Sequence, residues 1–210
     1  MDNALIIFIK NPALGKVKTR LARTVGDAKA LDIYLELTRI TRENVLKLSG
    51  KARKSTNILR GVKRHVFYSD FVNSSDEWAN NRFTKHVQTG DDLGERMSNA
   101  FSDILKTHKN AVIIGSDCPT LTTEIMELAF AQLETHDFVV GPSTDGGYYL
   151  LGFGQNNINN FVFDNMTWST DTVLPTILNR IEEHGKTVCL LPALTDIDEE
   201  KDWVDYTLQL

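Results

Sequence analysis

Short apolar runs alternate along this chain with longer segments of helical periodicity, and this alternation limits the possible folds more than any other feature. The runs, most of them apolar throughout, are residues 4–9, 63–68, 111–114, 138–141, 148–153 and 187–191. Such strands are usually buried on both faces. Apolar residues recur at helical spacing between them, in segments 27–49, 92–106, 122–134 and 170–184. This order predicts an α/β protein whose mostly parallel sheet is covered by helices.

The ends of these segments carry residues typical of helix caps. Thr122 precedes Glu124 and an apolar series, which indicates an N-terminal cap, and Gly185 follows its segment as a C-terminal cap. Ser169 or Thr170 is expected to cap the last long helix. On the longest helix, the face expected to be buried carries Leu31, Tyr34, Leu35, Thr38 and Val45.

Length and charge narrow the class of protein. A chain of 210 residues, 41% of them hydrophobic, can bury roughly 70% of its unfolded surface in one core, so we expect residues 1–210 to form a single domain. The formal net charge of −5 argues against a nucleic-acid partner, because duplex binders carry a concentrated basic face. A small anionic ligand is still compatible with this net charge, since the charge around a binding site can be opposite in sign to that of the whole protein.

The two cysteines and the first apolar run indicate in which cellular compartment the protein is expected. Cys118 and Cys189 lack the spacing of a zinc site or a disulfide framework and are expected to be reduced, packed thiols. The first run has six residues, too few for a membrane span, and no small-residue cleavage site follows it. We therefore expect a cytoplasmic protein with no membrane span, and the sequence leaves its oligomeric state open. The polar segment 51–63 is expected to be a mobile surface loop.

Ligands of parallel sheets bind beyond the carboxyl ends of the strands, so segments that follow strands are candidates for chemistry. Residues 10–20, KNPALGKVKTR, hold four cations around Gly15: Lys10, Lys16, Lys18 and Arg20. The segment is not a Walker loop, because Val17 follows the Gly-Lys pair. Gly15 would let backbone amides approach a phosphate that the cations neutralise, and Arg can bind two oxygens at once. A solvated basic loop is the alternative.

The strand at residues 111–114 leads to an acid. Asp117, within Gly115-Ser-Asp-Cys-Pro119, is expected at the mouth of the sheet. A Mg²⁺ or Mn²⁺ ion that bridges two phosphates could use such a carboxylate. An Asp that stabilises a turn is the alternative.

The strand at residues 138–141 leads to Asp145-Gly146-Gly147 and then Tyr148. A hairpin turn would explain the two glycines. The connection is longer than a hairpin needs, however, and paired glycines let the backbone approach a ligand closely. Asp145 would then hold a sugar or acceptor hydroxyl, with general base as its second possible role.

Three other segments have simple structural explanations. The acidic run at residues 194–202 suits a helix N-terminus, and only the alternation of Asp196 and Asp198 suggests that one carboxylate turns inward as a second metal ligand. Residues 88–96 read as a turn that enters a helix. Trp168 is expected to pack, with stacking on a substrate as the alternative.

Together these segments resemble a bacterial family of glycosyltransferase-A-like proteins, often described as uncharacterised or linked to arsenosugar biosynthesis. The likeness covers nearly the whole chain. The residues that carry it are Lys10-Asn-Pro12 with Gly15 and Lys18-Thr-Arg20, Gln88 with Leu93-Gly-Glu-Arg96, Gly115-Ser-Asp-Cys-Pro119, Gly141-Pro142 with Asp145-Gly-Gly-Tyr-Tyr-Leu-Leu151, and Asp196-Ile-Asp198 with Asp202.

The resemblance implies a Rossmann-like three-layer αβα sandwich of the nucleotide-diphospho-sugar transferase type, known as glycosyltransferase-A. It implies that the basic loop holds phosphates through Lys10, Gly15, Lys16, Lys18, Thr19 and Arg20, and that the turn from Gln88 to Gly94 lies near the nucleobase. Asp117 corresponds to the metal-binding acid of such enzymes, and Asp198 to a second ligand near the carboxyl terminus. The metal would be Mg²⁺ or Mn²⁺.

Two departures from related patterns keep the reaction type open. Glycosyltransferases of this fold usually carry Asp-x-Asp at the metal, whereas Asp117 is flanked by Ser116 and Cys118. Nucleotidyltransferases usually carry a Gly-x-Gly turn, and the basic loop has one glycine.

The leading hypothesis is a metal-dependent glycosyltransferase that takes a nucleotide-diphosphate sugar and a small-molecule acceptor. Arg20 and Asp145 would be its catalytic residues, and its substrate would contact Asp145, Gly146, Gly147, Tyr148 and Trp168. One alternative is a nucleotidyltransferase that joins an NTP to a small phosphorylated acceptor and releases pyrophosphate. Another is a catalytically degenerate nucleotide-binding protein, since fold does not establish activity.

Overall fold

One seven-stranded sheet forms the centre of the computed structural model, which describes residues 3–48, 61–157 and 160–209. The strand order is β3-β2-β1-β4-β6-β5-β7. The strands are β1 Ala4–Ile9, β2 Lys63–Tyr68, β3 Thr84–Val87, β4 Asn110–Ile114, β5 Phe138–Pro142, β6 Tyr148–Gly154 and β7 Val188–Leu190. Strand β6 runs antiparallel to both its neighbours, and the other pairs are parallel. The predicted α/β class with a mostly parallel sheet is confirmed.

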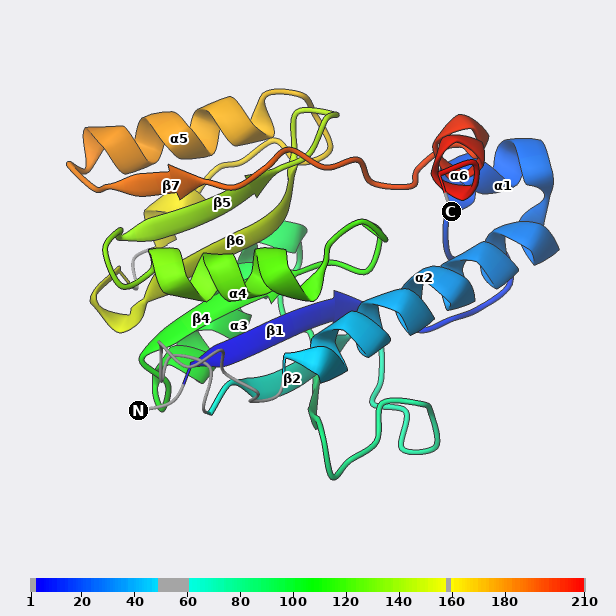
Figure 1. Cartoon of the computed structure of the whole chain (residues 1–210), viewed down its shortest axis with the longest axis horizontal. Coiled ribbons are helices and arrows are strands. Elements are labelled where there is room, and N and C mark those ends of the chain that lie inside the picture. The colour runs from blue at the N-terminus through cyan, green and yellow to red at the C-terminus, as the bar shows by residue number, and fades with distance from the viewer. Residues whose placement is uncertain (1–2, 49–60, 158–159, 210) are drawn as a thin grey trace.

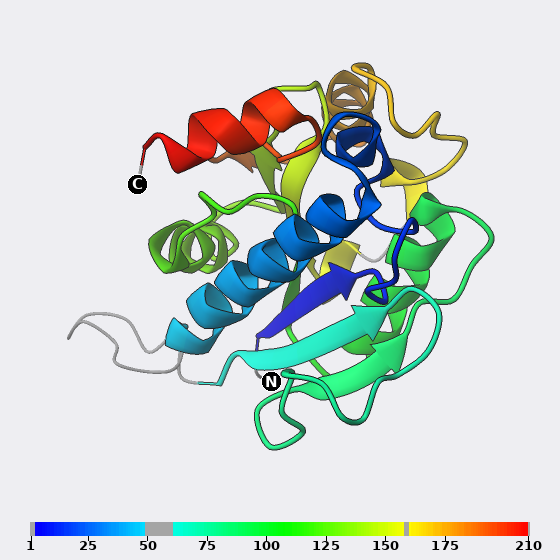
Figure 2. The ribbon, with the colours of Figure 1, turned by 90° about the vertical axis from the view of Figure 1, so that its right-hand side faces the viewer.

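Helices cover both faces of this sheet (Figure 2). The helices are α1 Thr19–Val25, α2 Asp27–Lys47, α3 Leu93–Leu105, α4 Thr123–Gln132, α5 Val173–Glu183 and α6 Glu200–Thr207, with 3₁₀ turns η2 Gln155–Asn157 and η3 Asn160–Val162. Helices α2 and α4 lie on one face, and α3 and α5 lie on the other. The expected three-layer arrangement is therefore present.

Strand β1 shows why the apolar runs lack alternation. Its residues Leu5, Ile7 and Ile9 enter the core beneath α2 and α4, whereas Ala4 and Ile6 enter the core beneath α3 and α5. Because successive side chains point to opposite faces, a strand covered on both faces must be apolar throughout.

A third apolar cluster joins the two ends of the chain. Leu21 of α1 and Ile33 and Leu37 of α2 pack with Ile197, and Trp203 of α6 lies against them. Helix α6 consequently lies beside α1 at the edge of the sheet where the parallel strands end (Figure 1). This packing brings the C-terminal segment to the predicted ligand-binding edge.

Two of the predicted helix caps are confirmed. The Thr122 hydroxyl accepts a hydrogen bond from the Ile125 amide at 3.4 Å. Gly185 adopts a φ of 63° after α5, and the Lys186 amide donates to the Ile181 carbonyl at 3.0 Å, as in a helix closed by a left-handed residue.

Other expectations about the elements are wrong. Helix α5 begins at Val173 after Thr172, so neither Ser169 nor Thr170 is its cap. The buried face of α2 carries Ala30, Ile33, Tyr34, Leu37, Thr41 and Val45. Leu35, expected inside, is 46% exposed, because the face that meets β1 and α1 is rotated from the one its apolar residues suggested. Strand β3 and helix α1 were not anticipated.

The remaining expectations concern the polar segment 51–63 and membrane spans. Residues 51–60 of the segment expected to be a mobile loop lie outside the described residues, and Lys63 begins β2. Within the described ranges, we find no helix with the length and hydrophobicity needed to cross a membrane.

Candidate functional site

A cleft of about 610 Å³ opens at the carboxyl ends of β1 and β4. Its wall is built from the loop after β1, the starts of α1, α3 and α5, the loop after β4, the β5–β6 connection and the segment before α6. Five carboxylates and three cationic side chains line it: Asp117, Asp145, Asp171, Asp196 and Asp198 with Lys10, Lys18 and Arg20. The described lining is therefore acidic, although the loop that opens it is basic.

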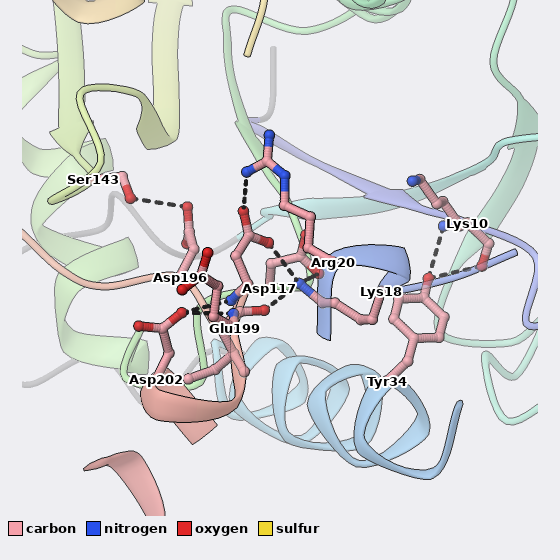
Figure 3. Close-up of polar contacts among 11 residues, drawn as sticks. Lys10, Lys18, Arg20, Tyr34, Asp117, Ser143, Asp196, Glu199 and Asp202 are labelled. Carbon is pink, nitrogen blue, oxygen red and sulfur yellow. Dashed lines mark hydrogen bonds and ion pairs between the residues drawn. The ribbon is translucent and has the colours of Figure 1, made fainter. Parts of the chain in front are cut away.

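Lys18 lies at the centre of the charged wall. Its ammonium Nζ is 2.9 Å from Asp117 Oδ1, 3.4 Å from Asp198 Oδ1 and 2.6 Å from the Ile197 carbonyl oxygen (Figure 3). The side chain is only 5% exposed. Its backbone has a φ of 47°, a left-handed conformation that costs a non-glycine residue about 1–2 kcal/mol. This strained residue starts α1 and directs its ammonium inward.

The C-terminal segment is fixed to the end of β4 around this lysine. The Ile197 amide donates to the Asp117 carbonyl at 2.9 Å. Asp198 also accepts from Arg20 Nη1 at 3.2 Å, and its own amide donates to the Asp202 carboxylate at 3.0 Å. Residues about 180 positions apart thus share one charged cluster.

Tyr34 of α2 orders the start of the basic loop. Its hydroxyl accepts from the Lys10 amide and donates to the Lys10 carbonyl, both at 2.8 Å (Figure 3). Burial, and then the negative charge of Asp117, raises the pKa of Tyr34 well above its ordinary value. The phenol therefore stays neutral and serves as a fixed hydrogen-bonding group.

Asn11, part of the Lys10-Asn-Pro12 motif, joins the loops that follow β1 and β2. Its side-chain amide donates to the Phe71 carbonyl at 2.9 Å, and its carbonyl accepts from the Asp70 amide at 3.0 Å. Gln88 has a similar structural role, because its amide donates to the carbonyls of Ile9 and Phe67 at 3.2 and 3.0 Å.

Asp196 is a partly buried acid that faces the same cleft. The Ser143 hydroxyl donates to its Oδ2 at 3.0 Å (Figure 3). Burial, followed by the negative charge of Asp117, raises the pKa of Asp196 to about 6. Asp145 adds to this repulsion, and its Oδ1 accepts from the Gly147 amide at 3.0 Å.

The opposite wall of the cleft is apolar and aromatic. The Tyr148 hydroxyl lies 3.3 Å from Met97 Sδ of α3, and burial raises the pKa of Tyr148 well above its ordinary value. Trp168 packs so closely on α3 that a Cβ at Gly94 would lie 2.8 Å from its ring. Leu93 and Val173 complete this side. Aromatic rings beside carboxylates can support a ligand that has apolar faces and hydroxyl groups.

Most residues predicted for the site meet here. Those that line the cleft are Lys10, Lys18, Thr19, Arg20, Gln88, Asp117, Asp145, Gly147, Tyr148, Trp168 and Asp198. Gly15, Lys16, Gly94 and Gly146 lie outside the described lining. Gly94 supports Trp168, and Gly146, with a φ of 89°, backs onto the Asp171 backbone.

Several lining residues were not singled out from the sequence. Tyr34 was expected on the buried face of a helix, and Met97 and Asp171 lie within segments expected to be helical. Asp196 was noted through its alternation with Asp198 and within the Asp196-Ile-Asp198 motif. An apolar stripe that contains a Tyr or Met carries no local signal for a ligand site, so only the position of its helix identifies such a residue.

The donor set suits a hard divalent cation. Asp117 and Asp198 converge on one point, as their shared contact with Lys18 Nζ demonstrates, and carboxylate oxygens are the ligands that Mg²⁺ prefers. The described residues contain no group of three or more His, Cys, Asp or Glu side chains arranged to hold a metal. Mg²⁺ commonly uses one or two carboxylates and completes its shell with substrate phosphates, so a carboxylate pair is compatible with such a site.

Residues 54–170 match the family described as "Uncharacterized protein conserved in bacteria (DUF2064)". This match spans more than half of the sequence. The chain belongs to this family. No curated protein matches the sequence.

Three solved structures show what this member of the DUF2064 family is similar to. A "putative nucleotide-diphospho-sugar transferase" from Desulfovibrio desulfuricans G20 is 28% identical, with a TM-score of 0.82 over 95% of this chain and 84% of that one. The inositol-1-phosphate CTP transferase from T. maritima is 14% identical, with a TM-score of 0.59 over 96% and 91%. A Mycobacterium tuberculosis H37Rv protein in complex with manganese is 12% identical, with a TM-score of 0.54 over the full length of both chains.

These likenesses establish the fold as that of the nucleotide-diphospho-sugar transferases. The first supports a transferase, whereas the other two are below 25% identity and bear on the fold alone.

Proposed function

We propose that this protein transfers a glycosyl group from a nucleotide-diphosphate sugar to a small hydroxylated acceptor. The observation that carries the proposal is the cluster of Lys18, Arg20, Asp117 and Asp198 in a cleft at the carboxyl edge of the sheet. Phosphate-binding cations and a carboxylate pair suited to Mg²⁺ or Mn²⁺ are what a diphosphate leaving group requires.

Each wall of the cleft has a role in this proposal. Arg20 and Lys10 would bind the diphosphate from the side of β1, with the nucleoside extending toward Gln88. Asp117 and Asp198 would hold the metal ion, which neutralises charge on the leaving nucleotide when it is bound. Asp145 would orient a hydroxyl of the sugar or acceptor, and Tyr148 and Trp168 would support the ring. Electrostatics and positioning would then supply most of the catalysis.

The charge distribution favours glycosyl over nucleotidyl transfer. Of the described residues that line the cleft, the cations belong to the loop after β1 and the start of α1, whereas Asp145 and Asp171 flank the β5–β6 side. A phosphorylated acceptor would meet carboxylates there, and like charges repel at short range. A neutral acceptor with hydroxyl groups would instead find hydrogen-bond acceptors.

The test is a panel of nucleotide sugars incubated with and without Mn²⁺, in which released nucleoside diphosphate is measured. We expect metal-dependent release with at least one donor, and a loss of at least about 100-fold in kcat/KM in Asp117→Asn. Asp164→Asn, an exposed acid outside the described lining, should behave as wild type.

Other products would decide between the alternatives. Pyrophosphate release from an NTP and a sugar phosphate would replace glycosyl transfer with nucleotidyl transfer, the reaction type that the name of the T. maritima CTP transferase suggests. Nucleotide binding without release of either product, and without an effect of Mn²⁺, would identify a catalytically degenerate nucleotide-binding protein. Cytoplasmic location and a single domain over residues 1–210 stay part of the proposal.

A further inference from the structure

We propose that Lys18 is the resident cation of the Asp117–Asp198 pair and yields both carboxylates to a divalent metal ion when the cleft is filled. The inference rests on the proposed function only in taking the ligand to be a diphosphate. Lys18 would then change partners when the ligand binds, whereas the basic loop alone would suggest a lysine that serves only to bind phosphate.

Lys18 lies where a metal ion shared by the two carboxylates would bind. Lys18 Nζ lies 2.9 Å from Asp117 Oδ1 and 3.4 Å from Asp198 Oδ1. A Mg²⁺ ion binds carboxylate oxygens at about 2.0–2.1 Å. An ion that contacted both carboxylates would lie in the space that the ammonium occupies, and two cations that close repel strongly in a partly buried site. Lys18 and a metal ion bound to these same two oxygens would therefore compete.

The surroundings of Lys18 allow such an exchange. Its stem is long and flexible, and its Nζ contacts the C-terminal segment at the Ile197 carbonyl and at Asp198 Oδ1. The segment keeps other attachments when those contacts break, because the Ile197 amide is bonded to the Asp117 carbonyl and the Ile197 side chain, 2% exposed, is packed in the core.

The charge balance also favours exchange. The described lining has more carboxylates than cations. A divalent ion in place of the Lys18 ammonium between Asp117 and Asp198 would therefore reduce the excess of negative charge. The freed ammonium would remain within the cleft, where it can pair with a phosphate oxygen as a compact point charge. The same lysine would thus stabilise the empty cleft and then the bound diphosphate.

The experiment compares Mn²⁺ binding by calorimetry in wild type, Lys18→Met and Lys16→Met, with Mn²⁺ alone as the probe. Met keeps a long unbranched side chain, one atom shorter than that of Lys, and removes the charge. We expect Lys18→Met to bind Mn²⁺ at least about tenfold more tightly, because the competing cation is gone. Lys16, exposed on the same loop and outside the described lining, controls for a general change in charge and should leave the affinity unaltered.

A second measurement uses the wild-type chain, in case Lys18→Met fails to fold. Amine-reactive labelling followed by mass spectrometry should find Lys18 protected without metal, since its side chain is 5% exposed. Saturating Mn²⁺ should raise its labelling several-fold and leave Lys16 unaffected.

Three results would overturn the exchange: equal or weaker Mn²⁺ binding in Lys18→Met, unchanged Lys18 labelling when Mn²⁺ is bound, or no Mn²⁺ binding by any of the proteins. The proposed function fails separately, when no nucleotide sugar yields a nucleoside diphosphate. If Lys18→Met binds Mn²⁺ more tightly but the wild-type chain releases no nucleoside diphosphate from any nucleotide sugar, the exchange at Lys18 is supported and glycosyl transfer is rejected.

Discussion

At the scale of single residues, Asp196 should make the stability of the fold depend on pH in the acidic range. Burial and the charge of Asp117 raise its pKa from 3.8 to about 6 in the folded chain. As the pH rises through this interval, the unfolded chain loses its proton first, so the protonated carboxyl stabilises the fold below pH 4 and that contribution is lost by about pH 6.

Replacing Asp196 by Asn should remove this loss, because the Asn side-chain carbonyl can still accept the hydrogen bond from Ser143. We expect the free energy of unfolding of Asp196→Asn, relative to wild type, to rise by on the order of 2 kcal/mol between pH 4 and 6 and then to level off. Urea denaturation of both proteins across this range measures the difference. A difference that does not vary with pH would contradict the raised pKa.

At the scale of elements, three glycines in the connections between strands and helices differ in backbone conformation and surroundings. Gly146 in the β5–β6 connection has a φ of 89°, and a Cβ there would lie 2.5 Å from the Asp171 Cα. Gly185 after α5 has a φ of 63° with open space around it, and Gly115 in the cleft lining has open space and no positive φ. Substitutions at these three positions can therefore distinguish the cost of backbone strain from the cost of a steric clash.

Alanine substitutions should therefore rank in a fixed order. Gly115→Ala should change the free energy of unfolding by less than about 0.5 kcal/mol, and Gly185→Ala should lower it by about 1 kcal/mol through strain alone. Gly146→Ala should lower it by more than about 2 kcal/mol, because strain and a backbone clash combine. Chemical denaturation provides the values. A harmless Gly146→Ala would mean that the β5–β6 connection is free to move away from Asp171.

At the scale of the whole molecule, the site depends on the C-terminal segment staying packed against α1 and α2. Ile197 is buried in that cluster, next to Asp198. Ile197→Ala should lower the free energy of unfolding by about 2–5 kcal/mol and weaken Mn²⁺ binding about tenfold, since Asp198 loses its support.

Ile181→Ala is the matched control for this prediction. Ile181 is fully buried in α5, in the core beneath α3 and α5. Its truncation should cost similar stability and leave Mn²⁺ binding intact. Equal weakening in both variants, measured by calorimetry, would attribute the effect to general instability and remove the special role of the C-terminal packing.

Much of this architecture could be predicted from the sequence because its signals are local. Runs such as 4–9 and 111–114 indicate strands buried on both faces wherever they occur, and a carboxylate placed after such a run, as Asp117 is, must lie at the strand's end. The topology rule for parallel sheets then brings the loops after β1 and β4 to one edge. The caps at Thr122 and Gly185 likewise depend only on neighbouring residues.

What the sequence could not determine depends on contacts between distant segments. The buried face of α2 is set by its docking against β1 and α1, so Leu35 is exposed despite its hydrophobicity. Tyr34 and Met97 join the cleft only because their helices pass beside it. Above all, the contact of Lys18 with both Asp117 and Asp198 arises from the packing of Ile197. The sequence determined which charges this protein carries at its strand ends, and tertiary packing decided which of them neutralise one another, because electrostatic energy depends on distance in space.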